Sequence, residues 1–360
     1  MRDASLIDSE RRRGRGALSN GDGRFERHTH VEDDDGWGSL ETLERFTTET
    51  QIEQARSIIS HNDSPDLSFD RSINPYRGCE HGCIYCYARP THAYLGHSPG
   101  LDFETKLYAK TNAAELLENE LAKPGYVPKT IALGAVTDPY QPIERTYQIS
   151  RQILEVMDRT SHPVGIVTKS ALVVRDIDIL QRLAERDLVR VALSVTTLDA
   201  RVARAMEPRA ATPSRRIETI KRLSEAGIPT TIMTAPIIPG LTDYEIEAIL
   251  TAGRDAGAES ASYVLLRLPL ELKTLFREWL EESFPDRASR VINLLQSMHG
   301  GADYRSDFGL RQRGSGPFAE LIGQRFHKAI KRLGLNQRHL RMPTDLFQPP
   351  AKAGDQLTLL

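Results

Sequence analysis

The stretch Asn74-Pro75-Tyr76-Arg77-Gly78-Cys79-Glu80-His81-Gly82-Cys83-Ile84-Tyr85-Cys86-Tyr87 contains every cysteine of this 360-residue chain. The spacing is C-x3-C-x2-C, and three thiols cannot all pair as disulfides within one chain. Soft thiolates gathered on a short loop are typical ligands of iron–sulfur clusters and of zinc. A cluster held by three cysteines keeps one iron free for a substrate, much as a catalytic zinc keeps an open position.

A zinc site is the main alternative at these cysteines. Either His81 or His92 could complete a Cys3His set with the three thiolates. Zinc motifs usually contain paired C-x2-C units, however, and this chain has no second cysteine pair. We therefore favour an iron–sulfur cluster, and we expect His81 to lie beside the site rather than to bind metal.

Composition is typical of a water-soluble globular protein, with 39% apolar and 27% charged residues. The formal net charge is −2, so the chain as a whole is not a strongly basic nucleic-acid binder. The chain contains no run of 18 apolar residues, so we expect no membrane span, and no apolar core of signal-peptide length follows the N-terminus. Few cysteines and no targeting segment favour the reducing cytoplasm, where an oxygen-sensitive cluster survives.

Strand and helix patterns alternate through the middle of the chain. Short apolar runs predict strands, and the longer amphipathic stretches between them predict helices. The expected strands cover residues 71–74, 130–136, 164–168, 189–195, 230–235 and 261–268. The expected helices cover residues 111–122, 144–159, 177–184, 217–226 and 244–256.

These six strand–helix units imply parallel strands joined by right-handed crossovers. The first strand would deliver the cysteine loop at its carboxyl end, where barrel enzymes place their active sites. The pattern by itself fits a partial barrel and a doubly wound sheet equally well.

The cysteine motif, with Tyr85 directly before Cys86, resembles the radical S-adenosylmethionine (SAM) superfamily. The resemblance implies that Cys79, Cys83 and Cys86 hold three irons of a [4Fe–4S] cluster while the fourth iron chelates SAM. One electron then cleaves SAM and releases a 5′-deoxyadenosyl radical. It also implies that Tyr85 covers the adenine ring. For the fold, it favours an α/β partial (β/α)6 TIM-like barrel with a C-terminal helical extension.

Three further segments narrow the resemblance to the branch related to spore photoproduct lyase. They are residues 72–79, residues 137–141 (Thr-Asp-Pro-Tyr-Gln) and residues 168–170 (Thr-Lys-Ser), and the match covers roughly residues 65–270. The matching positions imply SAM contacts from Lys169 and Ser194. An ammonium can donate to the SAM carboxylate, and a hydroxyl can bond the ribose or the carboxylate.

The ends of two more predicted strands are expected to border the SAM site. Thr137 and Asp138, at the end of the second strand, would face the SAM amino group or ribose. The Pro236–Gly240 turn after the fifth strand resembles a loop that packs on adenine. Each has a plainer explanation, Asp138 as the start of a turn before Pro139 and the Pro236–Gly240 segment as an ordinary turn.

One departure from that branch concerns the hydrogen-atom donor. Spore photoproduct lyase uses an additional cysteine near the end of the second strand, where this chain reads Gly134-Ala135-Val136-Thr137. No spare cysteine exists here, and Tyr140 is a nearby tyrosine that could replace it. The repair activity is therefore not carried over to this chain.

Changes in amino-acid composition and in apolar patterning along the chain predict its domain organisation. We expect a disordered tail over residues 1–45, a core barrel over 46–270, a helical extension over 271–348 and a second tail over 349–360. Helical stripes near 272–280, 288–298 and 318–333 predict three helices in the extension. Residues 305–345 carry nine Lys or Arg against three Asp or Glu, a basic surface able to steer phosphates.

Together these observations predict a radical SAM enzyme with a [4Fe–4S] cluster and SAM as cofactors, acting on an unidentified and plausibly nucleic-acid substrate. A flavodoxin or ferredoxin is the implied one-electron donor. One alternative is a radical SAM enzyme that modifies a protein or peptide. A second is a non-enzymatic zinc or cluster protein that binds nucleic acid.

Overall fold

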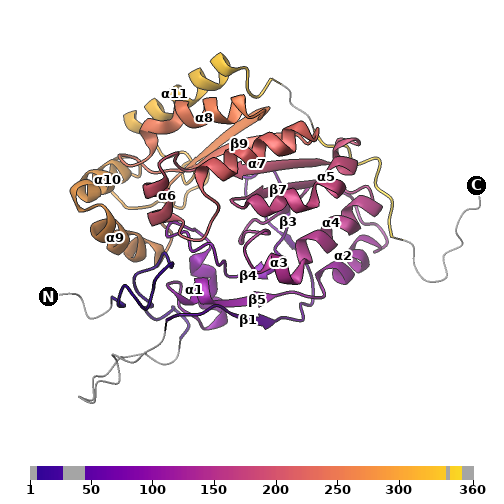
Figure 1. Ribbon diagram of the computed structural model, residues 1–360, viewed down its shortest axis with the longest axis horizontal. Coiled ribbons are helices and arrows are strands. Elements are labelled where there is room, and N and C mark those ends of the chain that lie inside the picture. Colours follow the sequence, from indigo (N-terminus) through magenta and orange to yellow (C-terminus); the bar gives the residue numbers. More distant parts are fainter. Residues whose placement is uncertain (1–5, 27–44, 338–340, 351–360) are drawn as a thin grey trace, which may run out of the picture.

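The computed structural model describes residues 6–26, 45–337 and 341–350 (Figure 1). A mixed α/β core occupies its centre, with helices layered around a strongly twisted sheet. The expected tail residues 27–44 and 351–360 lie outside the described residues. No helix in the described part of the chain is long and apolar enough to cross a membrane.

A seven-stranded sheet forms the core, in the order β10-β9-β8-β7-β6-β3-β2. Six of its strands are parallel, and β2 pairs with β3 antiparallel. The bounds are β2 Ile59–His61, β3 Arg71–Ile73, β6 Ile131–Leu133, β7 Val164–Thr168, β8 Val189–Ser194, β9 Thr230–Ile237 and β10 Ser260–Leu265.

The strand order decides between the two folds that the sequence left open. The six parallel strands lie beside one another in chain order, as in a TIM-type barrel, whereas a doubly wound sheet reverses direction at a switch point. Among the described residues β10 and β2 are the two edges and do not pair with each other. The predicted partial barrel, open on one side, is confirmed.

Helices cover the outer face of this sheet. They are α2 (Ala113–Leu121), α3 (Glu144–Tyr147), α4 (Ile149–Arg159), α5 (Ile177–Ala184), α6 (Ala200–Met206), α7 (Pro213–Glu225) and α8 (Ile246–Asp255), with short 3-10 helices η3 (Ala171–Asp176) and η4 (Asp243–Glu245) leading into α5 and α8. The predicted helix over 144–159 is interrupted, because Gln148 adopts a left-handed conformation with φ 50° and separates α3 from α4.

Successive side chains of these strands alternate between the helix-covered face and the concave face. Ile232 of β9 packs directly on Gly253 of α8, where an added Cβ would lie 2.4 Å from its Cδ1. Because side chains alternate along a strand, the flanking Thr231 and Met233 point to the concave face. Register extends that face to Ala192 and Gly165 and also to the larger Arg190 and Val167. At Gly165 an added Cβ would meet no atom within 4 Å, so there is room inside the open barrel at that point.

A second, three-stranded sheet was not predicted. It has the order β1-β5-β4, with β1 Glu49–Ile52, β5 Lys106–Ala109 and β4 Tyr76–Arg77. The short helices η2 (Arg89–Leu95) and α1 (Asp102–Thr105) connect it to the segment that bears the cysteines. This small sheet fixes both ends of the cysteine loop, because β4 precedes the loop and β5 follows the two helices.

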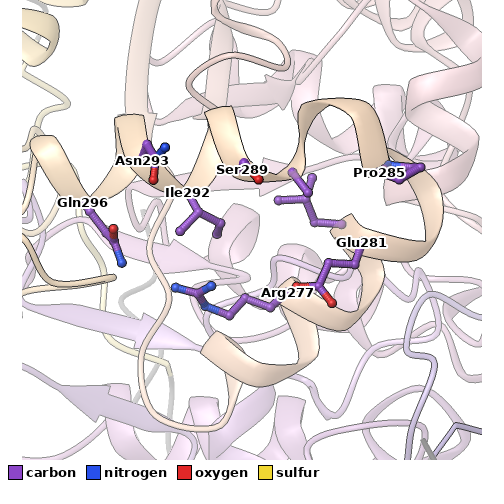
Figure 2. Close-up of a pocket in the computed structure, with 9 residues that line it drawn as sticks. Arg277, Glu281, Pro285, Ser289, Ile292, Asn293 and Gln296 are labelled. Atoms are coloured by element: carbon purple, nitrogen blue, oxygen red, sulfur yellow. The ribbon is translucent and has the colours of Figure 1, made fainter. Parts of the chain in front are cut away.

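The C-terminal part is helical, as predicted, with α9 (Leu272–Ser283), α10 (Pro285–Ser297) and α11 (Pro317–Leu333). Figure 1 shows α11 lying along α8, where Arg325 donates to Glu247 at 2.8 Å. A polar cavity of about 560 Å³ opens between α9 and α10 (Figure 2). Every residue that lines this cavity belongs to α9 or α10, so it is not part of the barrel site.

Residues 6–26 do not form a loose tail. Ala17 and Leu18 are buried in the main hydrophobic core, and Arg15 is buried as well. Composition predicted disorder for this segment because it has few apolar side chains, and for residues 6–26 that prediction is wrong. The segment is held by hydrogen bonds from the Gly16 and Ala17 backbone and from the polar side chains of Arg15, Ser19 and Asn20, which composition does not report.

Candidate active site

The cysteine loop begins directly after β4, beyond the carboxyl end of β3, as the sequence predicts. Gly78 and Gly82 turn the chain on either side of Cys79, with φ values of 71° and 67°. At Gly78 an added Cβ would also lie 2.7 Å from the Leu107 side chain and 2.8 Å from the Phe103 carbonyl oxygen. Glycine is therefore required there by conformation and by space.

A buried ion pair holds the backbone of the cysteine loop in place. Arg89 and Glu104 have fully buried side chains, and the guanidinium donates to Glu104 and to the backbone carbonyls of Gly82 and Cys83. The same guanidinium reaches the carbonyls of Pro99 and Gly100. Five acceptors around one planar cation fix the path of the loop, and no sequence spacing pointed to this pair.

The N-terminal segment closes over this pair. Glu104 accepts hydrogen bonds from the backbone N–H groups of Gly16 at 2.9 Å and Ala17 at 2.8 Å. An added Cβ at Gly16 would lie only 1.8 Å from the carbonyl oxygen of Gly82. We call residues 15–20 the N-terminal clamp, because they press directly on the cysteine loop.

All three thiols are largely shielded from solvent. Cys79 and Cys83 are buried and Cys86 is partly buried. Burial raises the pKa of each thiol, while the Lys169 ammonium opposes that rise at Cys83 and Cys86. In the metal-free protein the thiols therefore stay protonated at neutral pH, and binding a metal must release their protons.

These residues fit a cubane cluster. The chain supplies three cysteines on one loop, a cation beside two of them and rigid backbone support. Within the described ranges, no three His, Cys, Asp or Glu side chains converge tightly enough to hold a single metal ion. A cluster has a different requirement, since each thiolate binds its own iron.

Asp138 connects two strand ends to the cysteine loop. Its carboxylate accepts from the Thr168 hydroxyl and the Lys169 backbone N–H, both at 2.7 Å, and Nδ1 of His81 lies 3.3 Å from Oδ2. Burial raises the pKa of Asp138, but His81 and these donors outweigh burial and lower it to about 2. Asp138 is therefore an anion at neutral pH, with both carboxylate oxygens already engaged.

Thr137 is turned toward the cysteine loop. Its hydroxyl donates to the Gly78 carbonyl at 2.7 Å and accepts from the Gln141 amide at 3.1 Å. The carbonyl oxygen of that amide receives the Glu80 backbone N–H at 2.8 Å. Thr137 and Gln141 thus hold the start of the loop, a role that the sequence motif of residues 137–141 does not reveal for Gln141.

Tyr85 and Lys169 meet beside the cysteines. The Lys169 ammonium lies 5.6 Å from the Tyr85 ring centroid, within cation–π range. The Tyr85 hydroxyl donates to Glu207, which also accepts from Thr196 and from Arg216. Tyr85 is buried, so its ring orientation is fixed before any ligand arrives.

Ser194 completes the set of predicted SAM contacts. It ends β8 on the concave face, paired in register with Met233 of β9. Arg216 donates to the Ser194 backbone carbonyl at 2.9 Å, which fixes this strand end. The Arg216–Glu207 pair is buried like Arg89–Glu104, and sequence inspection missed both because neither pair has a characteristic spacing.

The remaining residues singled out from sequence lie elsewhere. His92 is buried in η2 against Phe103, and burial together with His97 lowers its pKa to about 4. Tyr140 is fully buried and its hydroxyl donates to Asp176 at 3.0 Å, which engages the hydroxyl on the helix-covered side. Pro236 and Ile237 complete β9, and Gly240 turns the chain after it with φ 77°.

Comparison with known proteins agrees with this geometry. The radical SAM superfamily model matches residues 73–252, half of the chain. An uncharacterised protein of Mycobacterium tuberculosis is 37% identical over 230 residues, covering 63% of this chain and 68% of its own. A radical SAM Nα-GlyT isomerase of Pseudomonas phage M6 is 28% identical over 196 residues, covering 51% of this chain and 38% of its own.

Among solved structures, spore photoproduct lyase complexed with a dinucleoside spore photoproduct has the same fold. The TM-score is 0.57 at 14% identity, covering 79% of this chain and 80% of the lyase. Enzymes of the matched superfamily bind a [4Fe–4S] cluster and SAM, and the cysteine loop fits that cluster. This chain belongs to the radical SAM superfamily.

Proposed function

We propose that this protein reductively cleaves SAM at a [4Fe–4S] cluster held by Cys79, Cys83 and Cys86, and abstracts a hydrogen atom from a nucleic-acid substrate. One observation carries the proposal. The chain's three cysteines lie together on one loop at the carboxyl end of an open partial barrel, within the segment matched by the superfamily.

When bound, the cluster supplies the electron that cleaves SAM, delivered by an external flavodoxin or ferredoxin. The chain's own contribution is placement. Lys169 offers an ammonium to the SAM carboxylate beside Cys83 and Cys86, and Ser194 offers a hydroxyl from the neighbouring strand end. Tyr85, locked by Glu207 and Lys169, forms a fixed aromatic wall for the adenine ring.

Asp138 and Thr137 complete the proposed SAM site at the end of β6. Both already hold neighbouring backbone groups, so their contribution is to fix strand ends as well as to border the ligand. The open space at Gly165 on the concave face leaves room for SAM or for a substrate group beside it. The half-closed barrel shields that space from bulk water, which protects a reactive radical.

Two observations support a nucleic-acid substrate. The spore photoproduct lyase of the same fold is solved with a dinucleoside, and residues 305–345 of this chain carry an excess of basic side chains. A protein or peptide substrate is the alternative within the same chemistry, and a nucleic-acid effect on turnover separates the two.

The test is an anaerobic assay of the reconstituted protein with SAM and dithionite, with 5′-deoxyadenosine and methionine as the readout. Wild-type protein should form both products, and Cys83→Ala should form neither. Added DNA or RNA should raise the yield, whereas a response only to peptides would favour the alternative. A full iron and sulfide load without product would overturn the proposal, and zinc at one per chain without iron would favour the metal-binding module.

A further inference from the structure

A loop from the C-terminal part spans the open side of the barrel. The Leu265 backbone N–H, on the free edge of β10, donates to the Gln312 carbonyl at 2.9 Å. At the opposite edge, Asp66 lies between β2 and β3 and accepts from the Gly309 N–H at 2.7 Å and from Arg311 at 2.5 Å. We call residues 303–314 the strap, because they tie the two sheet edges together.

The strap meets the cysteine loop through a stacked cation. Arg267 follows β10, and its guanidinium lies 5.0 Å from the Tyr87 ring centroid, while its Nε and Nη2 atoms donate to the Tyr304 hydroxyl at 3.4 Å and 3.3 Å. Tyr87 comes directly after Cys86, and its hydroxyl donates to the Ala135 carbonyl just beyond β6. Through its stacking on Tyr87 and its hydrogen bonds to Tyr304, Arg267 therefore joins the cysteine loop, the end of β10 and the strap at the carboxyl end of the barrel.

This rim exposes aromatic surface that a packed core would bury. The Tyr87 side chain is 46% exposed, and Phe308 on the strap is 60% exposed. The Arg311 guanidinium lies 4.7 Å from the Phe308 ring centroid while it also holds Asp66. Among the described residues no carboxylate lies within ion-pair distance of Arg267, so its charge is available to an anion.

Cations interleaved with exposed aromatic rings match the chemistry of an unstacked polynucleotide. Base faces stack on aromatic side chains and on guanidinium planes, and phosphates are attracted to arginine. Because the strap closes the side of the barrel, the concave face is reached past this rim. A base enters such a site only after leaving its stack, which is easiest in a single strand.

We propose that Tyr87, Arg267, Tyr304 and Phe308 form a binding rim for an unstacked nucleotide of single-stranded nucleic acid. The proposal rests on the proposed function and names the form of its substrate. It makes the strap the element that selects a single strand over an intact duplex.

The test measures fluorescence anisotropy of a labelled strand of about 12 nucleotides and of the same sequence as a blunt duplex. Reconstituted full-length protein is used. The single strand should bind more tightly than the duplex. Arg267→Gln and Phe308→Ala should each weaken strand binding about tenfold, since one stacked base contributes about 1–3 kcal/mol. Phe308 is exposed, so its variant is expected to fold.

Lys331→Gln is the matched control, because Lys331 is an exposed basic residue of α11 and lies outside the strap. Its affinity should stay within about twofold of wild type at fixed salt, since one phosphate contact contributes a modest screened attraction. Equal losses of strand affinity in Arg267→Gln and Lys331→Gln would show that a diffuse basic surface, and not the rim, binds the strand. Equal binding of duplex and single strand would also overturn the proposal.

The binding measurement and the SAM-cleavage assay together distinguish failure of the proposed rim from failure of the proposed chemistry. Wild-type protein that forms 5′-deoxyadenosine but binds no strand overturns the rim and leaves SAM cleavage standing. Wild-type protein that binds the strand but forms no 5′-deoxyadenosine supports the rim and overturns the proposed function.

Discussion

The N-terminal clamp and the strap are both segments outside the repeating strand–helix units, and both close over the barrel. They do so by opposite means. The clamp reaches a fully buried ion pair through backbone N–H groups and touches the cysteine loop with no room for a side chain. The strap ties the two sheet edges with few hydrogen bonds and exposes Phe308, Arg305 and Arg313.

The difference separates two requirements of one active site. A metal cluster needs ligands held at fixed positions, and buried charges with all partners present fix a loop tightly. A substrate rim needs accessible surface, and exposed cation–π contacts leave both partners able to meet a ligand. Substitutions in the clamp should therefore affect folding and cluster retention, and substitutions in the strap should affect access.

The largest expected effect is the loss of Glu104. Glu104→Ala leaves the Arg89 guanidinium buried without its carboxylate, which costs about 3–5 kcal/mol of unfolding free energy. Urea unfolding of the reduced, cluster-free protein measures this cost. Glu10→Ala is the control, because its exposed contact between the N-terminal segment and Arg45 should contribute less than about 1 kcal/mol. Similar costs for the two variants would show that the buried pair has no special role.

A smaller effect is expected from Gly16→Ala. The added methyl group would overlap the Gly82 carbonyl oxygen, so either the clamp or the cysteine loop must shift, at about 1–3 kcal/mol. The reconstituted variant should release iron to a ferrous chelator faster than wild type. Gly21→Ala is the matched control, since no atom lies within 4 Å of an added Cβ there. Unchanged iron release in Gly16→Ala would mean that the clamp does not position the cluster loop.

The same contrast explains what the sequence could predict. β7 over residues 164–168 and α5 over 177–184 agree with their patterns residue for residue, because burial of apolar side chains decides both. The three cysteines were identified from spacing, Lys169 and Ser194 from the resemblance to the spore photoproduct lyase branch, and Asp138 from its place at a predicted strand end. Their assigned contacts with SAM stay predictions.

The clamp and the strap had no such signal. Gly16 and Ala17 act through backbone N–H groups, and Glu104 meets them 87 and 88 positions along the chain, so no local pattern reports the contact. The contacts of Arg267 with Tyr87 and Tyr304 unite residues from three distant segments. The interruption at Gln148 was also missed, because the apolar pattern of 144–159 continues through it and only the backbone conformation changes.

The smallest expected effect concerns the strap tether. Burial raises the pKa of Asp66, but the Gly309 amide and the Arg311 guanidinium outweigh burial and hold it below the usual carboxyl value. A lowered pKa means that the tether is at full strength above the usual value and is lost as pH falls through the lowered one. Asp66→Asn should therefore speed hydrogen–deuterium exchange in strap peptides at neutral pH without changing exchange in β7 or β8.

The pH dependence sharpens this test. Below the lowered pKa the wild-type carboxyl is protonated, so wild type and Asp66→Asn should exchange their strap amides at the same rate, after correction for the intrinsic effect of pH. Asp307→Asn is the control, since Asp307 forms only an exposed pair with Arg305 within the strap. If Asp307→Asn exchanges as fast as Asp66→Asn at neutral pH, the strap is not held by its link to the opposite sheet edge. The barrel would then be open on that side, and a duplex would reach the concave face as readily as a single strand.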